Sequence, residues 1–284
     1  MKILLTGANG QLGQCFQDRV PDDWDVWATD TSELDITNNE QVLKAVETFK
    51  PDIIVNAAAY TAVDKAETEI DIAKSVNEDG PRNLAIAANR YGAILFHVST
   101  DYVFDGSSKT PYLENDLTNP LGIYGKTKLD GEKAVITNSP TAIIIRTAWV
   151  FSEYGGNFVK TMLRLGREKK ELSIINDQRG CPTYAGDIAQ AIIEMIKIKT
   201  SCGIYHFCGD KEVSWYEFAE HIFKKAVDAN IISRSPSLNA ITTDAYPTAA
   251  KRPSYSSLNC TKMKVIGINP SNWMYALEKV LAKL

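Results

Sequence analysis

The chain has 284 residues, 44% of them hydrophobic and 23% charged, with a formal net charge of −4. This composition is ordinary for a globular protein with a large core, and the acidic balance argues against a nucleic-acid partner, which would require a basic surface. No stretch reaches the ~18 consecutive apolar residues of a membrane span, and the N-terminus has no export signal, so we expect a cytoplasmic protein with no membrane partner.

The cysteines and histidines are scattered along the chain. The five cysteines form neither a C-x-x-C pair nor a disulfide-dense framework, which fits a reducing compartment. No histidine has a second ligand at metal spacing, so we expect no metal site. His97 lies in an apolar run, where a satisfied core histidine is the simpler interpretation.

The first residues predict a strand, a glycine turn and a helix. Residues 2–6 form a short apolar run, and Gly7, Gly10 and Gly13 follow at G-x-x-G-x-x-G spacing. Such a unit aims backbone N–H groups and the positive end of a helix dipole at one point, where a pyrophosphate can bind. We assign Gly7 to the tight turn, Gly10 to close approach of phosphate, and Gly13 to helix packing. A purely structural turn is the alternative, but the order of strand, turn and helix favours binding.

A second predicted strand, residues 25–30, ends in Asp30. In dinucleotide-binding units, a carboxylate about 20 residues beyond the glycines accepts hydrogen bonds from the adenosine ribose. The alternative is a surface acid that ends a strand. A site that binds the 2′-phosphate of NADPH would carry Arg or Lys just after this acid, but this chain has Thr31 and Ser32. The sequence therefore favours NADH over NADPH.

Strands and helices then alternate. A helix is expected over 39–50, a strand over 52–59, a helical region over about 66–91 and a strand over 93–100. This alternation predicts an α/β protein with a Rossmann-like, doubly wound parallel sheet, which binds ligands at the carboxyl ends of its strands. Ser99, Thr100 and Asp101 stand at such an end.

The second half is less regular. Beyond a polar loop, the expected elements are helices over 124–137, 156–167, 187–197, 214–227 and 272–284, and strands over 142–150, 172–177 and 203–208. We therefore expect a smaller C-terminal substrate-binding domain. The proposed division gives a dinucleotide-binding domain of residues 1–150 with about 177–208, and a substrate-binding domain of about 151–176 and 209–284.

Tyr124 and Lys128 lie one helical turn apart, so both side chains leave the same face of the helix. A nearby ammonium favours the phenolate and should lower the pKa of Tyr124 from its ordinary value of ~10 toward neutrality. Such a phenol could exchange a proton near pH 7. Tyr275 and Lys279 have the same spacing on the last helix, but that helix has the apolar spacing of a packing element, so we assign that pair to structure.

Together with Thr100, the Tyr124 pair forms a Ser/Thr, Tyr, Lys set, and here the chain resembles the extended short-chain dehydrogenase/reductases. Within them it is similar to the dTDP-4-dehydrorhamnose reductase family over nearly its whole length. The resemblance rests on LLTGANGQLG, VNAAAYTAVDKAE, STDYVFDG, YGKTKLDGE, RTAWVF and the late AYPTAAKRPSYSSLN. It implies that hydride passes from NADH or NADPH to the C4 carbonyl of dTDP-4-dehydro-L-rhamnose, a nucleotide sugar, giving dTDP-L-rhamnose.

The resemblance also implies roles for individual residues. The catalytic set would be Thr100, Tyr124 and Lys128. The residues in contact with the pyrophosphate, the adenosine and the far side of the cofactor would be Gly7, Gly10, Gln11, Leu12, Gly13, Asp30, Asp35, Ile36, Ala59, Tyr60, Thr61, Tyr124 and Lys128. Asp101 and Trp149 would contact the sugar.

One position departs from the family. Members that join subunits through magnesium carry a glutamate where this chain has Cys15, so no metal site is carried over, although a homodimer stays open. The substrate diphosphate needs donors outside the cofactor site. Asn157 at the start of a helix and Arg252 in the C-terminal part are the candidates, and a solvated loop is the alternative for Arg252.

Two other functions stay open. The same fold could serve a reductase or an epimerase of another nucleotide sugar. A non-catalytic regulatory subunit resembling the β subunit of methionine adenosyltransferase is the alternative from a different class, although the intact Thr100, Tyr124 and Lys128 set argues against it.

Overall fold

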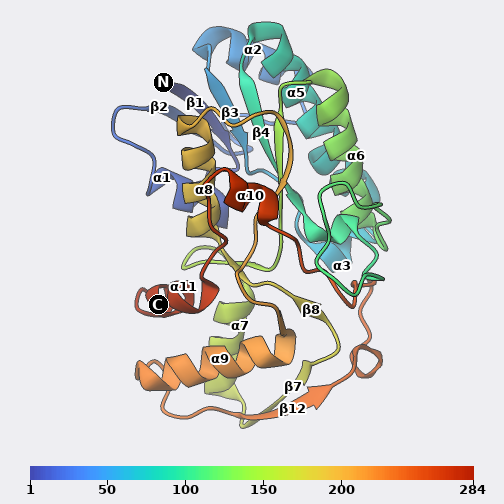
Figure 1. Ribbon diagram of the computed structural model, residues 1–284, viewed down its shortest axis with the longest axis vertical. Helices are drawn as coiled ribbons and strands as arrows, with labels where there is room; N and C mark the ends of the chain where they lie inside the picture. The colour runs from blue at the N-terminus through green and yellow to red at the C-terminus, as the bar shows by residue number, and fades with distance from the viewer.

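The centre of the molecule is a six-stranded sheet in the order β10-β5-β4-β3-β1-β2, with every neighbouring pair parallel. The computed structural model describes all 284 residues, and Figure 1 shows this sheet in the upper part of the molecule. The strands are β1 (Lys2–Thr6), β2 (Asp25–Thr29), β3 (Ile53–Asn56), β4 (Ile94–Thr100), β5 (Ile143–Thr147) and β10 (Gly203–His206).

Helices cover both faces of the sheet because its strands are apolar on both sides. In β1, Ile3 and Leu5 point into a core of 42 buried residues, whereas Leu4 points into a separate core of 16. The first core includes α1 (Gln11–Gln17) and α8 (Ala185–Lys197), and the second includes α2 (Asn39–Phe49) and α5 (Gly80–Tyr91), beside α6 (Ile123–Asn138). The predicted doubly wound α/β fold is confirmed.

The strand order reverses direction between β1 and β3. From β1 the chain moves outward to β2, then returns across β1 to β3 and continues through β4 and β5 to β10. Open parallel sheets bind ligands at such a switch point, beyond the carboxyl ends of the strands. The glycine turn after β1 lies at this place.

The lower part of Figure 1 contains α7 (Phe158–Glu168), α9 (Trp215–Asp228), β7 (Glu171–Ile175) and β12 (Ser237–Ile241) from the second half of the chain, whereas α8 lies beside the sheet. Helices α7 and α9 lie beside β7 and β12, which form a parallel pair of strands. The larger core continues from the sheet into α7, α9 and α11 (Trp273–Leu281). The remaining short elements are β6 (Val150–Phe151), β8 (Arg179–Gly180), β9 (Thr183–Tyr184), β11 (Val213–Ser214), two 3₁₀ turns (Asp101–Val103 and Thr243–Ala245) and α10 (Thr261–Val265).

Some expected elements differ. The strand expected over 52–59 ends at Asn56, whose side chain turns the chain by accepting a hydrogen bond from the Ala58 backbone N–H (3.1 Å). The helical region expected over 66–91 is broken into α3 (Val63–Ala66), α4 (Ile70–Lys74), a π-helix (Ser75–Asp79) and α5. Strand β12 was missed because its residues are mostly exposed and show no alternation.

The cysteines are less scattered in space than in sequence. All five are free, but Cys208 Sγ lies 3.6 Å from Cys260 Sγ, and Cys208 also hydrogen-bonds to Cys181. No group of three or more His, Cys, Asp or Glu side chains is arranged to hold a metal ion. None of the helices combines the length and apolarity that a membrane crossing requires.

Candidate active site

The glycine turn follows β1 with the geometry its residues permit. Gly7 has a φ of +73°, and a Cβ there would lie 2.6 Å from the Ala58 backbone nitrogen. A Cβ on Gly13 would lie 2.2 Å from the Gly7 carbonyl oxygen, so only glycine lets α1 pack this closely. Gly10 is different, since its Cβ would approach only the Gly7 oxygen, at 3.3 Å. The outer side of the turn is therefore open to a ligand.

A cavity of about 210 Å³ lies beside this turn. Asp30 is at its edge, and its carboxylate is held in place because Oδ2 accepts from the Asn9 N–H (3.1 Å) and Oδ1 from the Thr31 N–H (2.8 Å). The cavity is lined by Gly7, Gly10, Asp30, Thr31, Leu34, Asp35, Ile36, Thr37, Ala57, Ala58, Ala59 and Val76. Small residues and a fixed carboxylate suit the adenosine half of a dinucleotide.

Asp35 and Ile36 form the far wall of this cavity. The Asp35 carboxylate accepts from the N–H (2.9 Å) and hydroxyl (2.7 Å) of Thr37, which fixes the turn before α2. Ile36 is buried, and its side chain lies where a Cβ on Gly80 would be. Ile36 therefore shapes the cavity, whereas Asp35 Oδ2 accepts no hydrogen bond from the protein.

Tyr60 and Thr61 follow Ala59 along the edge of the sheet, and Asn77 fixes their course. The Asn77 side chain accepts from the Tyr60 N–H (2.9 Å) and donates to the Tyr60 carbonyl (3.0 Å) and the Thr127 hydroxyl (3.3 Å). Asn77 is fully buried in the π-helix, a kind of element often found at functional sites. Sequence reasoning missed it, since a lone Asn in a helical region carries no signal.

The predicted Thr100, Tyr124 and Lys128 set comes together where β4 ends and α6 begins. The Thr100 hydroxyl lies beside the Tyr124 phenol and donates to Asp101 Oδ1 at 3.0 Å. It also accepts from the Tyr102 N–H at 3.2 Å. A phenol, a hydroxyl and a carboxylate thus lie together at the carboxyl edge of the sheet.

The pKa of Tyr124 differs from the expectation. Burial raises it to about 12, the Thr100 hydrogen bond opposes this rise, and the Asp101 carboxylate adds to it. Lys128 does not lower it, because Lys128 Nζ donates to the Val98 carbonyl at 2.7 Å inside the protein. The prediction of a phenol tuned toward neutrality is therefore wrong. Desolvation of the ring is the largest cause of the raised pKa.

Asp101 is 2% exposed, and burial raises its carboxyl pKa to about 6. Hydrogen bonds from Ser256 and Thr100 oppose this rise. Its Oδ2 atom has no hydrogen-bond partner, although it is buried. Because buried polar groups are nearly always paired, this oxygen is available to a ligand hydroxyl or water.

Trp149 lies between β5 and β6 with a φ of +47°, a strained conformation for a bulky residue. Its ring stacks on Trp215 at 3.5 Å with the planes 4° apart, and a Cβ on Gly180 would meet it at 2.6 Å. Gly180 of β8 and Trp215 of α9 therefore jointly fix the Trp149 ring.

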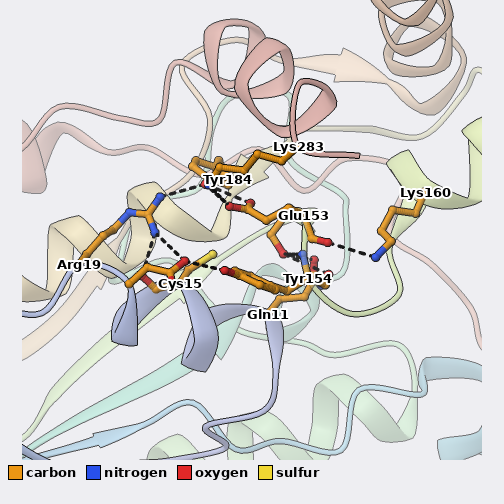
Figure 2. Close-up of polar contacts among 10 residues, drawn as sticks. Gln11, Cys15, Arg19, Glu153, Tyr154, Lys160, Tyr184 and Lys283 are labelled. Carbon is orange, nitrogen blue, oxygen red and sulfur yellow. Dashed lines mark hydrogen bonds and ion pairs between the residues drawn. The ribbon is translucent and has the colours of Figure 1, made fainter. Parts of the chain in front are cut away.

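Asn157 is used within the protein. As the N-cap of α7 it accepts from the Lys160 N–H at 3.1 Å, and its amide donates to Gln11 Oε1 at 2.9 Å. Gln11 also accepts from the Ser152 hydroxyl at 3.0 Å. Gln11, predicted to meet the pyrophosphate, thus ties the 152–157 loop to α1 (Figure 2), while Leu12 packs in the core.

A second group of contacts fixes the same loop (Figure 2). Arg19 donates to the Tyr184 hydroxyl at 2.9 Å, and that hydroxyl donates to Glu153 Oε2 at 3.1 Å. Lys283, next to the C-terminus, forms an ion pair with the same carboxylate. Cys15 is buried beneath this group, and burial raises its thiol pKa to about 12.

Arg252 forms a two-pronged ion pair with Asp64 of α3, at 3.1 and 2.7 Å. Its guanidinium also hydrogen-bonds to Tyr102, whose ring lies edge-on to that of Tyr124 at 5.5 Å. Lys251 beside it is exposed. The C-terminal segment is thereby fastened next to the predicted catalytic helix.

A doubly wound sheet, an open glycine turn with an adjoining cavity, and a Thr, Tyr, Lys set at the same edge define an NAD(P)-dependent reductase of the extended short-chain dehydrogenase/reductase class. A family model described as the RmlD substrate binding domain matches residues 1–284. A dTDP-4-dehydrorhamnose reductase from Aggregatibacter actinomycetemcomitans is 48% identical, with 99% of this chain and 98% of that protein covered. The chain belongs to the dTDP-4-dehydrorhamnose reductase family.

Solved structures of this family have the same fold. The dTDP-4-dehydrorhamnose reductase of Clostridium acetobutylicum has a TM-score of 0.94 at 41% identity, covering 99% of both chains. The Bacillus anthracis protein, solved in complex with NADP, has a TM-score of 0.93 at 38% identity, covering 100% of this chain and 99% of that one. The expected family and an NAD(P)H cofactor are thereby confirmed.

Proposed function

We propose that this protein reduces the C4 carbonyl of dTDP-4-dehydro-L-rhamnose with NADH or NADPH and releases dTDP-L-rhamnose. The observation that carries this proposal is the placement of the Thr100 hydroxyl beside the Tyr124 phenol at the carboxyl edge of the sheet. It lies on the side where the glycine turn opens, so a proton donor and a dinucleotide can meet at one carbonyl carbon. Membership of the family supports this substrate.

When bound, the reduced nicotinamide supplies the hydride. Tyr124 gives its proton to the oxyanion that forms at C4. A pKa of about 12 keeps the phenol protonated at neutral pH, which is the state that a general acid requires. Thr100 orients the phenol, and Lys128 approaches the ribose of the cofactor. A positioned acid of this kind contributes about 10²–10⁴ in rate.

For the cofactor, we propose that Gly7, Gly10 and Gly13 form the turn on which the pyrophosphate lies. Asp30 would accept from the ribose hydroxyls, because its carboxylate is already fixed at the edge of the cavity. The remaining contacts would come from residues on or next to the cavity wall: Gln11, Leu12, Asp35, Ile36, Ala59, Tyr60 and Thr61.

For the substrate, we propose that Asp101 accepts from a sugar hydroxyl through its unpartnered Oδ2. Trp149 would offer its ring, held by Trp215, to the apolar side of the sugar. Asn157 and Arg252 would serve the diphosphate, Asn157 through the first N–H groups of α7 and Arg252 as the cation beside Tyr102.

We also propose that residues 151–176 and 209–284 act as the substrate-binding domain, and that the protein works in the cytoplasm. The free thiols of Cys208 and Cys260, 3.6 Å apart, favour a reducing compartment. A homodimer is a further proposal, and sedimentation velocity at micromolar concentration tests it.

A panel of 4-keto nucleotide sugars, assayed by loss of reduced-nicotinamide absorbance with product analysis, tests the function. We expect turnover with dTDP-4-dehydro-L-rhamnose and formation of dTDP-L-rhamnose. Turnover with another nucleotide sugar alone would indicate a different reductase. An isomerised product without net oxidation of the cofactor would indicate an epimerase, and silence across the panel would favour a regulatory subunit.

A further inference from the structure

A buried ion pair lies one turn along α6 from the proposed catalytic lysine. Glu132 is 1% exposed and Arg146, on β5, is 2% exposed. Arg146 donates to both oxygens of Glu132, Nε to Oε1 at 2.9 Å and Nη2 to Oε2 at 2.7 Å. The Ser99 hydroxyl of β4 donates to Oε1 at 2.5 Å. The carboxylate is therefore fully desolvated and held by donors from two strands.

These donors come from the strands that lead into the site. Ser99 directly precedes Thr100, and Arg146 is three residues before Trp149. Arg146 Nη1 also donates to the Glu114 carbonyl at 3.3 Å, which ties the loop before α6 to the same group. One carboxylate thus sets the position of α6 relative to β4, β5 and that loop.

Lys128 occupies the same buried face of α6, four residues before Glu132. Its Nζ has one partner within the protein, the Val98 carbonyl, although an ammonium has three donors. Burial lowers the pKa of Lys128 to about 8, and the Glu132 carboxylate is the charge that opposes this fall. Without Glu132, the ammonium would have no buried counter-charge on its own helix.

The other titratable groups around α6 cannot replace Glu132. Burial and neighbouring cations lower the pKa values of His97 on β4 and His206 on β10, so both rings are neutral near pH 7. Asp101 faces Thr100 and Tyr124. The acidic groups of α3 and the π-helix are paired elsewhere, Asp64 with Arg252 and Glu78 and Asp79 with Arg82, and α5 contains no acidic residue.

We propose that Glu132 is a positioning residue for this reaction, which fixes the catalytic helix on the sheet and keeps Lys128 protonated in its buried place. This inference rests on the proposed role of Lys128 at the cofactor ribose. It does not depend on which sugar is reduced. The ion pair therefore serves the cofactor site as well as the core.

The test is the pH dependence of NADH and NADPH binding, measured by fluorescence between pH 6.5 and 9. In the unaltered protein the dissociation constant should rise as Lys128 loses its proton through about pH 8. Glu132→Gln keeps the shape and the acceptor for Ser99 but removes the charge, so the rise should begin about one pH unit lower. At pH 7.5 binding should be about threefold weaker, and at pH 6.5 it should be within about twofold of the unaltered protein.

Two further variants make the result decisive. Glu132→Gln with Arg146→Gln leaves no unpaired guanidinium in the core, so it should fold even where the single variant does not, and it should show a shift in the same direction. Asp130→Asn is the matched control, because Asp130 lies on the same helix and pairs with Lys133 at the surface. Its curve should follow that of the unaltered protein.

Several outcomes would overturn the proposal. The first is a dissociation constant of the unaltered protein that does not change with pH. The second is a loss of cofactor affinity in the variants by the same factor at every pH. The third is a dissociation constant that rises at the same pH in the variants as in the unaltered protein. The binding curves need no sugar substrate, so a protein that fails the nucleotide-sugar panel still gives a clear answer here.

Discussion

The positions of a few protons decide what this site can do. Thr100 has one hydroxyl proton, which it donates to Asp101, and its oxygen lies beside the Tyr124 phenol. Burial is the main cause that keeps the phenol in the protonated form, in which it can act as an acid. A raised pKa suits reduction, because an acid of low pKa would already be ionised at neutral pH.

Replacing Tyr124 by Phe removes only the hydroxyl. We expect kcat to fall by about 10²–10⁴ while the melting temperature and NADH affinity change little. Tyr275→Phe is the matched control, because Tyr275 is 59% exposed on α11 and its ring lies under the Lys279 ammonium at 4.3 Å, with no hydrogen bond from its hydroxyl. Steady-state kinetics of both variants check this. A normal kcat for Tyr124→Phe would exclude the phenol as the acid.

Asp101 should make the free energy of unfolding fall as the pH rises, which is the opposite of the usual effect of a carboxyl group. Its folded-state pKa of about 6 is above the ordinary 3.8, so the folded chain binds the proton more tightly and loses stability as pH rises through this window. The full cost is up to about 3 kcal/mol above pH 6. Asp101→Asn should therefore be more stable than the unaltered protein at pH 7.5, with a smaller difference at pH 4.5. Urea unfolding at both values measures this, and an equal loss of stability at both would contradict it.

Asp30 should set the choice between the two cofactors. Its fixed carboxylate accepts hydrogen bonds from a ribose and repels a 2′-phosphate. In Asp30→Ala, NADH binding should weaken by about tenfold and discrimination against NADPH should relax. Titrations of both cofactors against both proteins check this. Equal constants for NADH and NADPH in the two proteins would remove Asp30 from the account.

At the scale of elements, the packing of α1 depends on one missing methyl group. A Cβ on Gly13 would meet only backbone atoms, the Gly7 oxygen at 2.2 Å and the Ala8 Cα at 2.7 Å, so neither side can yield. Gly13→Ala should destabilise the protein by about 1–3 kcal/mol and weaken NADH binding, although Ala normally stabilises a helix. Gly156→Ala, with nothing within 4 Å of its Cβ, is the control for the melting temperature. A stabilised Gly13→Ala protein would refute the packing argument.

Sequence reasoning predicted best the elements that are buried on both faces. Strand β1 was expected over the residues it occupies, because its run is apolar on both faces. The π-helix and the break before α5 were missed, because they are fixed by Asn77 binding to Tyr60 and Thr127, which lie 17 and 50 residues away. Long-range hydrogen bonds of single polar residues leave no periodic trace in a sequence.

At the scale of the whole molecule, one core joins the sheet to the C-terminal helices, and the site lies where they meet. Gln11 and Asn157 join α1 to α7, Trp149 stacks on Trp215, and Arg252 binds Asp64. That Thr100 and Tyr124 lie together was predictable from the motif and its place after a strand. The proposed role of Glu132 and the raised pKa of Tyr124 were not, because burial follows from the whole fold.

Transfer of a label tests the central claim most directly. The protein is given dTDP-4-dehydro-L-rhamnose and reduced cofactor carrying deuterium at the transferable C4 position, and the product is examined by NMR. We predict dTDP-L-rhamnose with one deuterium on C4 of the sugar, formed by the unaltered protein and at about 10²–10⁴ lower rate by Tyr124→Phe. Unchanged sugar, or an isomerised sugar without deuterium, would contradict the proposed reduction.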